Sequence, residues 1–186
     1  MNTIHRRFCR SDAWRGIVHG KLLPWVLRDI ALGDEVLEIG PGPGVTTERL
    51  RERAARLTAV EIDERLATSL AERMRGTNVR VVHGDATRLA FPDGSFSGAV
   101  AFTMLHHVPS AALQDRLLAE VRRVLRPGGV FAGSDSTTSL VFRLLHVRDT
   151  NVTVPPETFA ARLRAAGFTD AEVHSGRGSF RFVARA

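Results

Sequence analysis

From residue 34 onward, short apolar segments alternate with amphipathic ones, and this alternation limits the possible fold more than any other feature. The run Val36-Leu37-Glu38-Ile39 is typical of a buried strand. By contrast, Leu113, Leu117 and Val121 recur at the spacing of one face of a helix. Strands that alternate with helices form βαβ units, in which the strands are parallel. The sequence therefore predicts an α/β fold with a mostly parallel sheet.

The pattern predicts seven strands, bounded by glycine, proline and aspartate, at about 36–39, 57–63, 79–85, 96–104, 130–134, 171–174 and 179–184. Helices are expected at about 48–57, 64–75, 110–125 and 155–166, and the N-terminal segment is also expected to be helical. Thr46 or Thr47 is a candidate N-cap for the first of these helices. Gly76 and Gly167 are expected to end the second and the fourth.

The 186 residues correspond to one domain, and 44% hydrophobic with 25% charged residues is a globular composition. We divide the domain, 1–186, into an N-terminal helical segment or lid (1–30), a cofactor-binding core (31–136) and an acceptor-side region with the last strands (137–186). No apolar run reaches the ~18 residues of a membrane span, and no secretory signal follows Met1. The single cysteine, Cys9, predicts neither a disulfide nor a zinc site. We expect a cytoplasmic protein without a metal.

The net charge of +6 is concentrated at the two ends of the chain. Residues 1–30 carry a net charge of +4 and residues 139–186 carry +3, whereas residues 31–138 carry −1. Basic ends of this kind can attract RNA, an anionic lipid surface or an acidic small substrate. An arginine-rich composition is the alternative explanation, since Lys21 is the only lysine.

A glycine-rich loop, Gly40-Pro41-Gly42-Pro43-Gly44, follows the first predicted strand. Glycines let the backbone approach a ligand closely, and the helix that follows offers free N–H donors. The spacing is G-x-G-x-G, whereas the dinucleotide fingerprint would place its third glycine at Val45. This difference disfavours a nicotinamide or flavin cofactor.

Two acidic residues stand at the ends of the next two predicted strands. Glu61 lies 21 residues after Gly40, where a carboxylate can accept hydrogen bonds from both hydroxyls of a ribose. Asp85 ends the third strand, where a carboxylate can receive the exocyclic amine of an adenine. Together with the glycine loop, these acids indicate a nucleotide-type site at the carboxyl ends of the strands.

The segments 36–44, 60–63, 84–86 and 125–129 resemble the successive motifs of class I S-adenosylmethionine-dependent methyltransferases. The resemblance implies a Rossmann-like three-layer α/β/α sandwich with a seven-stranded, mostly parallel sheet and one antiparallel strand. It implies a site for S-adenosyl-L-methionine, with S-adenosyl-L-homocysteine as product. The residues implied at this site are Glu38, Gly40, Pro41, Gly42, Gly44, Glu61, Ile62, Asp85, Ala86, Phe102 and Thr103. By this resemblance the glycines surround the methionine part, Glu61 binds the ribose and Asp85-Ala86 lies at the adenine. A polar residue is common where Phe102 stands, and Thr103 can take its place.

The acceptor is indicated by the residues after the fourth strand. The first half of the chain also resembles the ribosomal RNA adenine dimethyltransferases, but those enzymes carry an Asn-Leu/Pro-Pro-Tyr/Phe type motif at this point. Here Leu105-His106-His107-Val108 stands instead, and the chain has no tyrosine. This stretch and Leu125-Arg126-Pro127-Gly128-Gly129 resemble the quinone-biosynthesis C-methyltransferases. We expect a small-molecule or lipid-like acceptor; an RNA base, or cofactor binding without catalysis, are the alternatives.

Methyl transfer needs a general base only when the acceptor must lose a proton. His106, His107 and Asp135 are the candidate catalytic residues, and a structural role for the histidines is the competing interpretation. Arg143, His146 and Arg148 lie where this fold often forms its acceptor site. Because the chain has no large insert, the site is left open, or is completed by the N-terminal segment with Trp14, His19 and Trp25, or by a second subunit of a homodimer.

Overall fold

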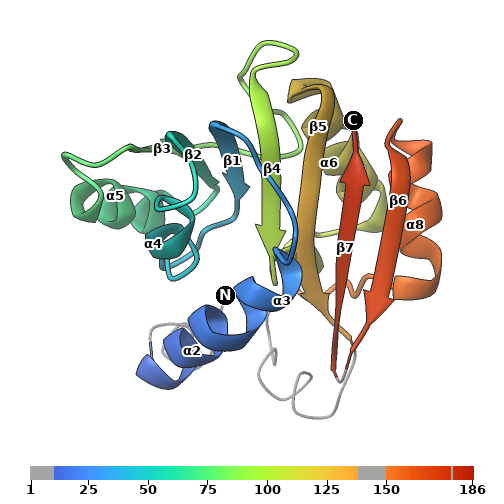
Figure 1. Cartoon of the computed structure of the whole chain (residues 1–186), viewed down its shortest axis with the longest axis horizontal. Coiled ribbons are helices and arrows are strands. Elements are labelled where there is room, and N and C mark those ends of the chain that lie inside the picture. Colours follow the sequence, from blue (N-terminus) through green and yellow to red (C-terminus); the bar gives the residue numbers. More distant parts are fainter. Residues whose placement is uncertain (1–10, 138–149, 177) are drawn as a thin grey trace.

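The sheet of the molecule has seven strands in the order β3-β2-β1-β4-β5-β7-β6 (Figure 1). The computed structural model describes residues 11–137, 150–176 and 178–186. The strands are β1 (Glu35–Ile39), β2 (Arg56–Glu61), β3 (Val79–His83), β4 (Phe96–Phe102), β5 (Leu125–Ser136), β6 (Thr169–Ser175) and β7 (Ser179–Arg185). β7 is antiparallel to both of its neighbours, and the other paired strands are parallel. The predicted fold, mostly parallel with one reversed strand, is confirmed.

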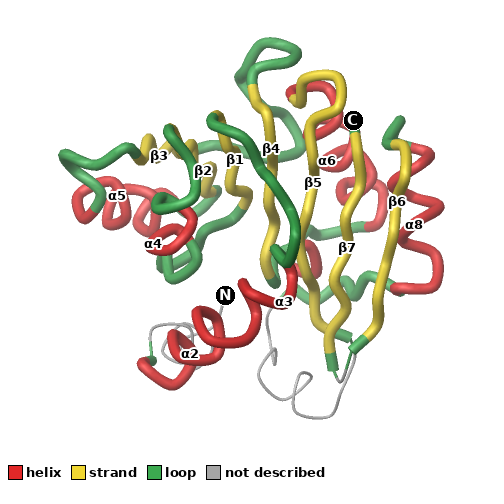
Figure 2. The backbone as a smooth tube through the Cα atoms, in the orientation of Figure 1, coloured by secondary structure: helices red, strands yellow, loops and turns green. Residues whose placement is uncertain are grey.

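Helices cover both faces of this sheet. α6 (Ala111–Val124) and α8 (Pro156–Ala165) pack on one face, behind β5, β7 and β6 in Figure 1. The other face carries α4 (Thr47–Leu50), α5 (Glu64–Arg73) and an N-terminal run of α2 (Asp12–Ile17), the π-helix η1 (Val18–Leu22) and α3 (Leu23–Val26). Figure 2 shows this N-terminal run as an almost continuous coil near the lower ends of β4 and β5. A short 3-10 helix, η2 (Leu105–His107), follows β4.

The helix predicted over 48–57 is wrong beyond residue 50. β2 begins at Arg56, where it pairs with Glu35, so Leu57 is buried in the sheet and not on a helix face. The intervening turn is closed by the Asn78 side chain, whose Nδ2 donates to the carbonyl oxygens of Arg51 and Ala54, both at 2.8 Å. Pairing between strands therefore overrides the local helical pattern in this segment.

Several predicted strand boundaries also differ, since β2 ends at Glu61 and β3 at His83, each two residues earlier than predicted. β4 ends at Phe102, two residues early, because Thr103 adopts a positive φ of 50° that a strand cannot continue. β5 extends from Leu125 to Ser136, beyond the predicted 130–134, since Leu125 pairs with Phe96 across a bulge and the strand pairs with β7 as far as Ser136. The helix predicted over 64–75 ends at Arg73, shortly before Gly76, whose φ is +77°.

Buried aromatic rings fill the layer between the sheet and the helices α6 and α8. Phe159 packs edge-on against Phe180 and Phe182, with ring centroids 5.5 and 5.0 Å apart. Phe182 also packs on Phe131 at 4.9 Å. Gly133 on β5 gives the Phe182 ring its space, because a Cβ at this position would lie 2.1 Å from the Ala101 carbonyl oxygen and 2.6 Å from that ring.

Among the residues that the structure describes, no helix is long and apolar enough to cross a membrane.

Gly133→Ala is expected to lower the free energy of unfolding by about 1–3 kcal/mol, because overpacking forces β4 and the Phe182 ring to shift. Gly16→Ala is the matched control. In α2 an added Cβ meets nothing within 4 Å, so this change should raise stability by roughly 0.5–1 kcal/mol. Urea unfolding of both variants measures the difference. Equal stability of Gly133→Ala and wild type would contradict the packing described.

Candidate active site

The predicted site residues converge where the strand order reverses. β1 lies between β2 and β4, so the chain leaves β1 toward one side of the sheet and leaves β4 on the other. This switch point leaves a crevice outside the carboxyl ends of the strands, where open α/β sheets bind ligands. The ends of β1, β2 and β4 carry Glu38, Glu61 and Phe102, and the loop 40–46 follows β1.

Glu38 is buried at the end of β1 and holds the far end of the glycine loop. Its two carboxylate oxygens accept hydrogen bonds from the hydroxyls of Thr46 and Thr47, the second at 2.7 Å. Thr46 occupies the predicted N-cap position of α4, but its side chain bonds Glu38 and makes no capping bond to the helix. Burial raises the pKa of Glu38 to about 7; the two threonine bonds oppose this shift, and the nearby Glu61 adds to it.

Glu61 is also buried, at the end of β2, and holds the middle of the same loop. Its Oε2 accepts the Gly42 N–H at 2.8 Å, and its Oε1 accepts the Asp63 N–H at 3.0 Å. Ile62, the next residue, leaves 68% of its surface exposed, the largest value among the big apolar side chains in the described part of the chain. A hydrogen-bonding carboxylate beside an uncovered apolar side chain matches a ribose and the flat face of a base.

Gly42 and Gly44 have different roles in the glycine loop. Both have positive φ, 55° and 84°. A Cβ on Gly44 would meet Leu70 of α5 at 2.3 Å, so this glycine lets the loop pack on the protein. A Cβ on Gly42 would meet no atom within 4 Å. The open side of Gly42 is thus a place where a ligand can approach the backbone.

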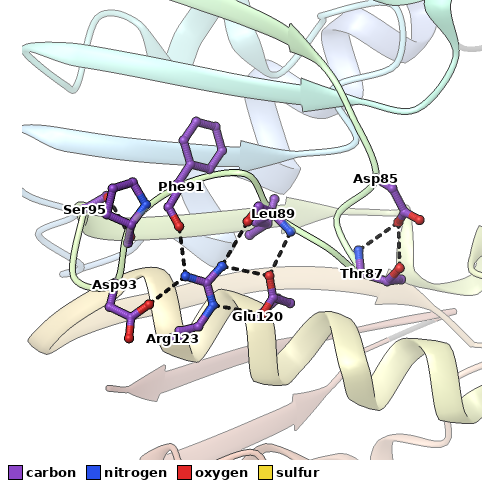
Figure 3. A network of polar contacts seen from close by, with 9 residues as sticks. Asp85, Thr87, Leu89, Phe91, Asp93, Ser95, Glu120 and Arg123 are labelled. Carbon is purple, nitrogen blue, oxygen red and sulfur yellow. Dashed lines mark hydrogen bonds and ion pairs between the residues drawn. The ribbon is translucent and has the colours of Figure 1, made fainter.

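Asp85 and Ala86 lie on the loop after β3, and a network of polar contacts fastens this loop to α6 (Figure 3). Asp85 Oδ1 accepts both the N–H and the hydroxyl of Thr87, each at 2.8 Å. Further along, Arg123 uses all five guanidinium donors on Leu89, Phe91, Asp93 and Glu120, at 2.7–2.9 Å. The Arg123 hydrogen bond holds the pKa of Glu120 below its usual range. No local sequence pattern marks this clamp, which fixes the loop that carries Asp85.

Phe102 and Thr103 end β4 in different environments. Phe102 is 6% exposed and packs in the apolar cluster beneath the N-terminal helical run. Thr103 is partly exposed and anchored by its N–H, which donates to the Ser134 carbonyl at 2.8 Å. Met104 covers Gly40, since a Cβ there would lie 3.1 Å from the methionine side chain. Thr103 is therefore the more accessible of the two predicted strand-four residues.

His106 and Asp135 form a buried pair between η2 and β5. The His106 ring Nδ1 lies 2.5 Å from Asp135 Oδ1, and the His106 N–H donates to Asp135 Oδ2 at 3.0 Å. The Ser136 N–H donates to Asp135 Oδ1 at 2.6 Å. The two side chains are 2% and 0% exposed. His107 is only partly buried, and its ring centroid lies 4.2 Å from that of His106.

The N-terminal run reaches the glycine loop through two polar contacts that sequence reasoning did not identify. His19 Nε2 bonds the Val45 carbonyl oxygen at 2.7 Å, and Arg15 pairs with Glu48 of α4 at 2.7 Å. Trp14 and Trp25 pack on the apolar cluster below. The candidates Cys9, Arg143, His146 and Arg148 lie outside the described residues.

These features fit S-adenosylmethionine. Glu61 supplies a buried carboxylate, Gly42 is open to a ligand, and Ile62 is uncovered beside Glu61. Fold and site together define a class I methyltransferase. The family model described as "Methyltransferase domain" matches residues 37–133, just over half of the chain. The chain belongs to this family, and it is an S-adenosylmethionine-dependent methyltransferase.

Solved structures share the fold over the full length. An S-adenosylmethionine-dependent methyltransferase from Aquifex aeolicus superposes with a TM-score of 0.75 at 18% identity, covering 100% of this chain and 98% of that chain. One from Archaeoglobus fulgidus gives 0.76 at 17% identity, with 98% and 97% covered.

Among curated proteins, ribosomal RNA small subunit methyltransferase A of Deinococcus radiodurans is 55% identical over 56 residues, which cover 30% of this chain and 19% of that protein. The matched segments span 19–40% of the length of such relatives.

Glu38→Gln is expected to remove a pH dependence of stability. Between pH 4.5 and about 7 the folded protein keeps a proton on Glu38 that the unfolded chain has lost. The contribution of Glu38 to the free energy of unfolding therefore falls as the pH rises through this window, by roughly 3 kcal/mol, and is level above it. Urea unfolding from pH 4 to 8 measures the difference between variant and wild type, with Glu72→Gln on the exposed face of α5 as control. A difference that does not change with pH would contradict the buried state of Glu38.

Proposed function

We propose that the enzyme transfers the methyl group of S-adenosylmethionine to a small-molecule or lipid-like acceptor by in-line displacement. The observation that carries this proposal is the end of β4. Enzymes that methylate a nucleobase must hold it unstacked, usually against accessible aromatic side chains. Here Phe102 is buried beneath the N-terminal run and His106 is locked to Asp135. Only His107 offers a partly exposed ring in this segment.

Alignment accounts for most of the catalysis in this proposal. The cofactor supplies an activated methyl group on a sulfonium. Glu38, Glu61 and Gly42 hold and orient the cofactor, while the N-terminal run covers the carboxyl ends of the strands and excludes water. Holding two reactants in a near-attack geometry contributes up to about 7–11 kcal/mol when the geometry is ideal.

For an acceptor that must lose a proton, we propose His107 as the general base. Its partial exposure at the end of η2 supports this assignment. The proposed role of His106 and Asp135 is to position η2 and the His107 ring. Both side chains are buried, and Asp135 accepts hydrogen bonds from the His106 ring, the His106 N–H and the Ser136 N–H, which supports this role. The single cysteine makes a reducing cytoplasm the proposed location.

An RNA base is the second candidate acceptor, and the ribosomal RNA methyltransferases among the relatives favour it. Those matches cover at most about half of this chain. The basic N-terminal and C-terminal segments would then bind phosphates, and affinity for RNA would fall steeply with salt.

Glu61→Gln is expected to weaken binding of S-adenosylhomocysteine at least tenfold, because an amide accepts fewer hydrogen bonds than a carboxylate and cannot serve both the loop and the ribose. Isothermal titration calorimetry measures the affinity. Glu64→Gln, on the exposed first turn of α5, is the control and should bind as wild type. Wild-type affinity in Glu61→Gln would contradict the ribose assignment.

Incubating the protein with methyl-labelled S-adenosylmethionine and extract of the source cell tests the acceptor class. The products are separated into RNA, protein, organic-soluble and small aqueous fractions. Label in the organic-soluble or small aqueous fraction is expected, and Glu61→Gln should reduce it. Label in RNA, sensitive to salt, would contradict the proposal and favour the second candidate.

A further inference from the structure

Ser134 and Arg181 lie side by side on the sheet, next to the end of β4. Ser134 on β5 pairs in register with Phe102 of β4 and with Arg181 of β7. Residues in register present their side chains on the same face of a sheet. Phe102 packs beneath the N-terminal run, so Ser134 and Arg181 also belong to this face. They stand on the acceptor side of the switch point, away from Glu61 on β2.

Arg181 uses one of its five guanidinium N–H donors within the described chain. Its Nη1 donates to the Trp25 carbonyl oxygen at 2.9 Å. Its Nε is buried and has no hydrogen-bond partner. The second terminal nitrogen, Nη2, makes no bond to any residue that the structure describes. Nε and Nη2 point in the same direction and form the side of the guanidinium that binds a carboxylate or phosphate through two parallel hydrogen bonds.

Ser134 also has a buried polar atom without a hydrogen-bond partner. The side chain is 0% exposed, yet its Oγ has no hydrogen-bond partner. Most buried polar atoms in proteins are paired, and an unpaired hydroxyl costs stability that an alanine would not. Two neighbouring donors without acceptors, one of them a permanent cation, leave the acceptor side of the site incomplete as it stands.

We propose that Arg181 and Ser134 form an acceptor subsite that binds an anionic oxygen group, a carboxylate or a phosphate, on the molecule to be methylated. In this arrangement Arg181 binds the anion through Nε and Nη2, and Ser134 Oγ donates a third hydrogen bond. The bond from Nη1 to Trp25 fixes the plane of the guanidinium and ties it to the N-terminal run. This inference rests on the proposed small-molecule acceptor and adds that the acceptor carries a negatively charged group.

The surrounding charges support an anion at this place. Asp135, the acid adjacent to Ser134, alternates to the opposite face and is bonded to His106. His174 of β6 pairs in register with Arg181 on the same face. Its carboxylate neighbour Glu172 lies 3.2 Å from the His174 ring and so is engaged there.

The test is isothermal titration calorimetry of the protein saturated with S-adenosylhomocysteine. Benzoate, phenyl phosphate and the neutral benzyl alcohol serve as probes. Wild type is expected to bind at least one of the two anions and to bind benzyl alcohol at least tenfold more weakly. Comparison of benzoate with phenyl phosphate tells whether the subsite prefers a carboxylate or a phosphate.

Three variants assign the binding to this subsite. Arg181→Met should weaken anion binding by at least about tenfold, the loss of one charge-assisted pair. Ser134→Ala should weaken it several-fold, while leaving the Trp25 contact intact and its melting temperature equal to or above that of wild type. Arg185→Met is the matched control, since Arg185 lies on the same strand and face, at the far end and exposed. It should bind as wild type.

Either of two results would overturn the subsite. One is that S-adenosylhomocysteine binds but neither anion binds more tightly than benzyl alcohol. The other is that Ser134→Ala and Arg181→Met bind the anions as Arg185→Met does. Failure of S-adenosylhomocysteine itself to bind wild type would instead contradict the cofactor site, and the subsite with it. The cofactor titration therefore separates the two failures.

Discussion

Two buried carboxylates hold the glycine loop from two points, and the geometry of the cofactor site depends on them. Glu38 fastens the far end of the loop through the hydroxyls of Thr46 and Thr47, and Glu61 fastens its middle through the N–H of Gly42. A loop rich in glycine loses much conformational entropy on folding, so these bonds are needed to order it. Burial raises the pKa of Glu38, and the charge of the nearby Glu61 adds to this shift. In the proposed site, a cationic cofactor would favour the ionised carboxylates and so stabilise the loop.

The sequence predicted those parts of the fold that depend on local pattern. The order of strands and helices, the reversed strand, and the positions of Glu61 at the end of β2 and of Asp85 just after β3 follow from periodicity and from the family motifs. The helix over 48–57 was wrong because the pairing of β2 with β1 decides the state of Leu57. Thr46 is the N-cap residue of α4 as predicted, but the bonds of the Thr46 and Thr47 hydroxyls could not be predicted because their partner, Glu38, is supplied by the preceding strand. Likewise, nothing local marks Arg123 as the clamp of the loop that carries Asp85.

The pairing of His106 with Asp135 changes how the end of β4 is understood. From the sequence, both were candidate bases of equal standing, 29 residues apart. In the structure Asp135 accepts from the His106 ring, the His106 N–H and the Ser136 N–H, so its oxygens are committed to joining η2 to β5. The His106 carbonyl also accepts the Val152 N–H at 2.8 Å, which brings the segment before α8 to the same point. A group that joins three segments is suited to positioning, and this argues for His107 as the residue that meets an acceptor.

The buried polar atoms that lack a hydrogen-bond partner in the described chain lie near the edge where the parallel strands end. Away from this edge, Ser97 at the start of β4 accepts from the Glu35 N–H and donates to nearby carbonyls, and Arg123 uses every donor. At the edge, Ser134, Arg181 and Asn151 hold the unpaired buried side-chain atoms found in the described chain. Sequences that specify one fold tend to violate local rules only at functional sites. The cofactor side of the edge is well paired through Glu38 and Glu61, so the unpaired groups mark the acceptor side as the part of the site whose bonds await a substrate.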